Sequence, residues 1–141
     1  MSSFDCVKMK SVFKIGDKKA FVRLVKEQDI ALFEGNVVHK VMATFAIARD
    51  AEWVGRLFVL DMLDEREEGI GTFVNISHLA PAFLAEEVIF EAVLSSIEKN
   101  SIVCDFEARV GSRLIATGKT GQKILSKEKI KSHFETIKGG R

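Results

Sequence analysis

The stretch from Val41 to Leu63 constrains the fold more than any other part of the chain. It is long, mostly apolar and helical in pattern, and an acidic run followed by Gly69 ends it. Its apolar residues surround most of the circumference, which is typical of a helix that is buried on nearly every side. We therefore predict one long helix that the rest of the chain encloses.

Segments rich in β-branched and aromatic residues lie on both sides of this helix. One strand is predicted before it, at 19–26, and residues 27–40 are predicted to form a loop or short helical turns around Gly35-Asn36. A terminal helix is predicted at 127–137, with Ile130, Phe134 and Ile137 spaced on one face. Four strands are predicted between the two helices: 70–78, 87–97, 101–110 and 114–125.

Three short segments carry turn signals. Glu98-Lys99-Asn100 should form a hairpin turn with Asn in the favourable place, and Val110–Arg113 a second tight turn. Gly69-Ile70-Gly71 lacks the third glycine of a dinucleotide motif and is also predicted to be a turn.

The predicted order is one strand, the long helix and then four strands in a meander. An antiparallel sheet with one apolar face needs a cover, and the long helix is the only predicted element large enough. We predict an α+β hotdog fold, a sheet wrapped around one central helix, as a single domain over residues 1–141. Such a sheet leaves an open edge, and pairing of two copies is the usual remedy.

Composition excludes fewer classes of function than the order of the residues does. A formal charge of +1 gives no reason to expect nucleic acid or an anionic membrane as a partner. No apolar run approaches the roughly 18 residues of a membrane span, and no signal peptide is evident, so cytoplasm is the expected compartment. Cys6 and Cys104 have no metal-like spacing and are expected to be reduced packing residues.

Three polar residues form the candidate site. Glu52 is an acid on a helix that should be enclosed, so it must be paired, lie near solvent or have a functional role. Thr44 precedes it by about two turns, a net rotation of roughly 80°, so both side chains could line one groove. His78 ends the strand predicted beside the helix and could transfer protons near neutral pH.

The sequence around these residues resembles the hotdog thioesterases of the fluoroacetyl-CoA thioesterase-like family. The likeness runs from about Val38 to Leu125, and its specific part is Ala-Thr-x7-Glu-Trp followed by Gly-Thr-x5-His. The resemblance implies that Thr44, Glu52 and His78 are catalytic. It also implies a homodimer with thioester sites near the subunit interface, and hydrolysis of a short acyl-CoA without metal or redox cofactor.

In such a mechanism Glu52 would be either the nucleophile or the base that activates water, since sequence does not separate the two. His78 would transfer protons and Thr44 would orient Glu52 or the thioester carbonyl. Backbone N–H groups near the helix start or at Gly69–Gly71 could stabilise the oxyanion, so Gly71 is a candidate substrate-binding residue. The segment after Phe33 has no aromatic residue before Thr44, so selectivity for a fluorinated acyl group is not inferred.

Structural alternatives exist for each residue. Glu52 could pair with Arg56 or Arg49 on a solvated helix face. Asp50, the nearest rival acid, lies on a different face and is expected to be solvated. His39 and His133 have no metal-ligand companions, and the lysines between 119 and 131 are expected to be a solvated surface.

Two other functions compete with hydrolysis. The chain could be a non-catalytic hotdog module that binds an acyl-CoA as a sensor or carrier. It could also be a hotdog hydratase or dehydratase, although that group usually places an Asp and a His on one short stretch, which is not found here.

Overall fold

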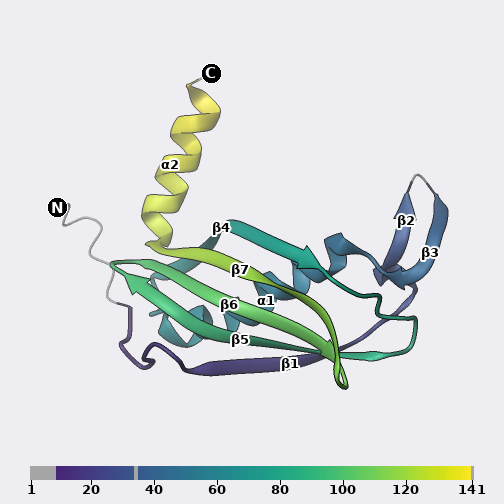
Figure 1. The fold of residues 1–141 in the computed structure, drawn as a ribbon. Coiled ribbons are helices and arrows are strands. Elements are labelled where there is room, and N and C mark those ends of the chain that lie inside the picture. Colours follow the sequence, from purple (N-terminus) through teal and green to yellow (C-terminus); the bar gives the residue numbers. More distant parts are fainter. Residues whose placement is uncertain (1–8, 34, 141) are drawn as a thin grey trace.

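The computed structural model describes residues 9–33 and 35–140 of the chain. A five-stranded antiparallel sheet has the order β1-β5-β6-β7-β4, and the long helix α1 packs against one of its faces (Figure 1). The elements are β1 (Lys18–Leu24), η2 (Glu27–Asp29), β2 (Ile30–Phe33), β3 (Asn36–Met42), α1 (Thr44–Met62), β4 (Glu67–His78), β5 (Glu87–Glu98), β6 (Ser101–Val110), β7 (Arg113–Ser126) and α2 (Lys127–Gly139).

Helix α1 is buried along one face. This face holds Ala46, Ile47, Asp50, Ala51, Val54, Gly55, Phe58, Val59 and Met62. The opposite flank exposes three large apolar side chains, Phe45, Trp53 and Leu60. The prediction of a helix enclosed on nearly all sides is therefore wrong for one chain, because a five-stranded sheet covers only the side it curves around.

Strands β5, β6 and β7 form a meander through tight turns, as the alternating pattern predicts. The first strand of the predicted meander departs from it, because β4 pairs with β7 instead of β5. Within residues 9–33 and 35–140, strand β4 is consequently an edge strand with one unpaired side. Gly69-Ile70-Gly71 lies inside this strand, so the predicted turn there is wrong.

The segment before α1 is a hairpin instead of the predicted loop or helical turns. After the single turn η2, strands β2 and β3 pair in antiparallel fashion around Gly35, whose φ of +83° suits a residue without Cβ. In the β5–β6 turn the left-handed residue is Lys99, with a φ of +56°, and the Asn100 side chain instead donates to the Ile124 carbonyl at 2.8 Å.

Two predictions outside the sheet have different outcomes. Helix α2 forms as expected, but none of its residues is buried. Cys104 is a free thiol in the core, where burial raises its pKa to about 12, whereas Cys6 lies outside the described residues. Within the described ranges, neither helix has the length and apolar character needed to cross a bilayer.

Candidate active site

Thr44 and His78 are in direct contact, although helix α1 and strand β4 separate them in the sequence. Thr44 is the first residue of α1 and His78 the last of β4, and a 2.9 Å hydrogen bond joins Thr44 Oγ1 to His78 Nδ1. Side chains alternate along a strand, so Ser77 points to the opposite face of the sheet. Both Thr44 and His78 are exposed to solvent, so a ligand can reach the pair.

Glu52 lies farther along the same helix, over a different part of β4. A Cβ atom at Gly71 would lie 2.5 Å from Glu52 Oε2, so the carboxylate occupies the space that a side chain at Gly71 would fill. Eight residues of α-helix place Glu52 about 12 Å from Thr44 along the helix axis. One copy of the chain therefore joins Thr44 to His78 but holds Glu52 apart from them.

The Glu52 carboxylate has no hydrogen-bond or ion-pair partner among the described residues. Arg56, one turn later, donates to Glu68 Oε1 at 2.7 Å and to the Gly69 carbonyl at 3.3 Å. The Gly69 N–H, and then the Arg56 guanidinium, hold the pKa of Glu68 below its usual range. Arg49 is also engaged elsewhere. The alternative in which Glu52 pairs with Arg56 or Arg49 is therefore wrong.

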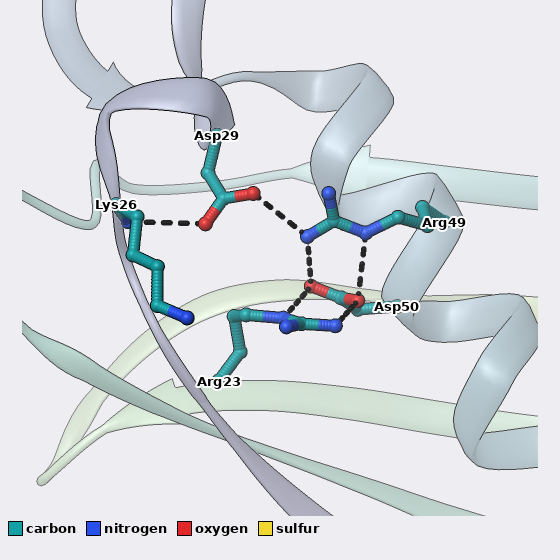
Figure 2. Close-up of polar contacts among 5 residues, drawn as sticks. All are labelled: Arg23, Lys26, Asp29, Arg49 and Asp50. Carbon is teal, nitrogen blue, oxygen red and sulfur yellow. Dashed lines mark hydrogen bonds and ion pairs between the residues drawn. The ribbon is translucent and has the colours of Figure 1, made fainter.

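Asp50 is the acid that α1 buries, contrary to the prediction that it is solvated. It is 0% exposed and accepts two hydrogen bonds from Arg23, at 3.1 and 2.8 Å (Figure 2). Two further bonds, at 3.0 and 2.9 Å, come from Arg49, which also reaches the buried Asp29 at 2.9 Å.

This ion network connects β1, η2 and α1. Hydrogen bonding to Asp50, and then to Asp29, raises the pKa of Arg49 above its usual range. The backbone also takes part, because the Ala43 N–H donates to the Asp29 carbonyl at 2.8 Å. Ala43 immediately precedes Thr44, so the network fixes the start of α1 and with it the Thr44 hydroxyl. Sequence spacing did not reveal this network, because Arg23 and Asp50 belong to separate elements.

Exposed apolar side chains lie on α1 and along the free edge of β4. Phe73 and Val74 on β4 are 44% and 37% exposed, and Phe45 and Trp53 on α1 are 52% and 41% exposed. Beneath the edge, the buried Gln122 of β7 pairs with Gly71 and donates to the Glu52 backbone carbonyl at 3.3 Å. The arrangement combines a carboxylate, a hydroxyl–imidazole pair and an apolar surface along one strand.

Comparison with known proteins connects this chain to thioesterases. The sequence profile of the FlK family, fluoroacetyl-CoA-specific thioesterase, matches residues 25–128. No curated protein sequence matches the chain.

Solved structures agree on the fold. A hypothetical protein of Thermus thermophilus, a thioesterase superfamily member, is 32% identical with a TM-score of 0.87, covering 92% of this chain and 96% of its own. A hot-dog-like protein from Thermanaerovibrio acidaminovorans is 22% identical with a TM-score of 0.82, covering 92% and 96%. A mutant of the fluoroacetyl-CoA-specific thioesterase FlK is 19% identical with a TM-score of 0.82, covering 91% and 99%. The predicted hotdog fold is confirmed.

Proposed function

Because the chain belongs to the fluoroacetyl-CoA-specific thioesterase family, we propose that it hydrolyses a small acyl-CoA thioester to the free acid and CoA. Solved complexes of FlK mutants, one with fluoroacetate and CoA and another with acetyl-CoA, support a substrate of this class. Thr44, Glu52 and His78 are the proposed catalytic residues. The observation that carries the proposal is the Glu52 carboxylate, which lies over Gly71 with no partner among the described residues, while the nearby arginines bind other acids.

The proposed active unit is a homodimer formed through the free edge of β4. Antiparallel pairing of two such edges satisfies the exposed N–H and C=O groups and covers apolar side chains around Val74 and Trp53. A twofold axis near Val74 would place His78 of one copy opposite Gly71 of the other. Each site would then combine Glu52 from one copy with the Thr44–His78 pair of the second, which accounts for their separation within a single chain.

In this site Glu52 either attacks the thioester carbonyl or removes a proton from the attacking water. The carbonyl oxygen gains negative charge in both cases, and backbone N–H groups at the start of α1 can stabilise it. Thr44 holds one nitrogen of His78, which leaves the other ring nitrogen free to deliver a proton to the departing CoA thiolate. Gly71 keeps space for the carboxylate.

The test is release of free thiol from a panel of acyl-CoAs, from acetyl to long-chain, with wild type, Glu52→Ala and Glu65→Ala. Glu65 is an exposed acid just beyond the end of α1 and serves as the control. We expect turnover of short acyl groups, a loss on the order of 10³-fold in Glu52→Ala and wild-type rates in Glu65→Ala.

Unchanged turnover in Glu52→Ala would remove the mechanism. If no ester were hydrolysed while acyl-CoAs still raised the melting temperature, the protein would be a binding module and not an enzyme.

A further inference from the structure

Helix α2 presents an apolar face that the described part of its own chain does not cover. Its base is well anchored, because Ser126 Oγ accepts from the Lys129 N–H at 3.0 Å and the Lys127 N–H donates to the Arg66 carbonyl at 2.8 Å. Beyond the base, Phe134 is 51% and Ile137 62% exposed. A helix of about 13 residues is marginally stable in water without packing contacts, so a partner is needed for this face.

The position of α2 indicates where that partner lies. A groove of about 470 Å³ separates the helix from Glu68, near the start of the edge strand β4. The α2 helix and the β2–β3 hairpin rise beyond the β4 edge from opposite ends of the sheet (Figure 1). The hairpin of the same chain is thus at the wrong end to cover α2.

The hairpin also carries exposed apolar side chains. Leu32 and Val37 are cross-strand partners, so they share one face of the hairpin, and they are 44% and 51% exposed. Strand β3 ends at Met42, two residues before Thr44. Whatever packs on this hairpin therefore supports the segment that leads into the start of α1.

A twofold axis through β4 exchanges the two ends of the strand, so α2 of one copy comes to the hairpin end of the other. We propose that the Ile130–Phe134–Ile137 face of α2 docks on the Leu32–Val37 face of the second copy's hairpin. Each copy thereby supports the hairpin that leads into α1 of the other copy. This inference rests on the β4 dimer of the proposed function, and its occupant is a second copy of this chain.

Crosslinking of the full-length protein tests the contact. Phe134→Cys and Val37→Cys are combined in a Cys6→Ser background and treated with a short bismaleimide. Cys104 stays in place, because its thiol is buried and its raised pKa keeps it unreactive. The matched control replaces Phe134→Cys with Ser132→Cys, about 200° around the helix.

We expect a covalent dimer, at twice the 15.7 kDa chain mass, from the Phe134→Cys pair and little from the Ser132→Cys pair. Phe134→Asp should also raise the dimer dissociation constant about tenfold or more, whereas Ser132→Asp should not.

Light scattering and thiol release separate the possible failures. A dimeric, active protein that crosslinks equally through both positions, or through neither, overturns the α2 contact and leaves the proposed function intact. A monomeric mass overturns the β4 dimer together with the α2 contact. If wild type hydrolysed no acyl-CoA but had a dimeric mass and gave the specific crosslink, the proposed function alone would be contradicted.

Discussion

Asp50 and Glu52 are two acids on one helix, two residues apart, in opposite environments. Asp50 is fully buried and receives four hydrogen bonds from two guanidinium groups. Glu52 is partly exposed and lies over a glycine without a described partner for its carboxylate. A two-residue step turns about 200° around a helix, which is enough to move one acid into the protein and the other to the β4 edge.

The difference shows how to separate a structural acid from a functional one. A buried carboxylate is stable only when hydrogen bonds and counter-charges replace water, and such saturation leaves little capacity for a substrate. An unpaired carboxylate beside an open strand edge keeps that capacity. The comparison predicts that changes at Asp50 reduce stability, whereas changes around Glu52 reduce activity.

The largest expected effect is on stability, in Asp50→Ala. Removal of this acid leaves Arg23 and Arg49 facing each other across an empty site. We expect a loss of about 3 kcal/mol in the free energy of unfolding, at the low end for a broken buried pair because both guanidiniums reach solvent. Urea unfolding at equal protein concentration measures this loss. The control, Glu52→Ala, should stay within about 0.5 kcal/mol of wild type. Equal losses in both variants would end the distinction.

The next effect is on activity, in Gly71→Ala. The added Cβ would come within 2.5 Å of Glu52 Oε2, the mobile end of a flexible side chain, so the carboxylate can move aside. We expect a small change in stability but a fall in kcat/KM of about 10- to 100-fold, because the reacting group is displaced by about 1 Å. Gly139→Ala is the matched control, since no atom lies within 4 Å of its added Cβ. Wild-type kinetics in Gly71→Ala would remove Gly71 from the site.

A smaller loss is expected for Thr44→Val. This change keeps the shape of the side chain but removes the hydroxyl that bonds His78 Nδ1 at 2.9 Å. Loss of one orienting hydrogen bond should lower kcat/KM about tenfold. Thr44→Ser retains the hydroxyl and should stay close to wild type. If Ser and Val variants were equally slow, packing of the threonine methyl group, and not the hydrogen bond, would be responsible.

Local pattern was sufficient for the elements that have strong periodicity. Strand alternation and short turn signals predicted β5, β6 and β7 nearly to the residue, and the apolar stretch predicted α1. The β2–β3 hairpin was missed because its register shifts twice within four residues, which destroys the alternation that a strand prediction needs. The placement of β4 beside β7 was also missed, since strand order depends on long-range pairing.

The same contrast between local pattern and long-range packing holds for the candidate site. Spacing and resemblance selected Thr44, Glu52 and His78, and the structure brings Thr44 and His78 into contact. The separation of Glu52 from that pair depends on how α1 crosses β4, which spacing does not encode. The burial of Asp50 depends on Arg23, which belongs to the first strand of the sheet. Sequence identifies reactive groups more readily than the distances between them.

The smallest expected effect concerns a third acid, Glu86, which is saturated like Asp50 but lies near the surface. Arg113 donates two hydrogen bonds to it, at 2.7 and 2.8 Å, and the Phe83 N–H donates a third at 2.7 Å. These bonds, those of Arg113 first, lower the pKa of Glu86 from an ordinary 4.5 to about 2. Because the folded value is the lower one, the stabilisation is present above about pH 4.5 and is lost as the pH falls toward 2.

Thermal unfolding of wild type and Glu86→Gln at several pH values from 6 to 2.5 measures this term. We expect wild type to melt at a slightly higher temperature near neutral pH and the gap to close below about pH 4.5. Glu87→Gln, at the exposed neighbouring acid, is the control and should follow wild type throughout. A melting-temperature gap that stayed constant down to the lowest pH would mean that the Glu86 charge contributes nothing to stability. Hydrogen bonding would then stabilise a carboxylate in this fold only when it is buried as deeply as Asp50.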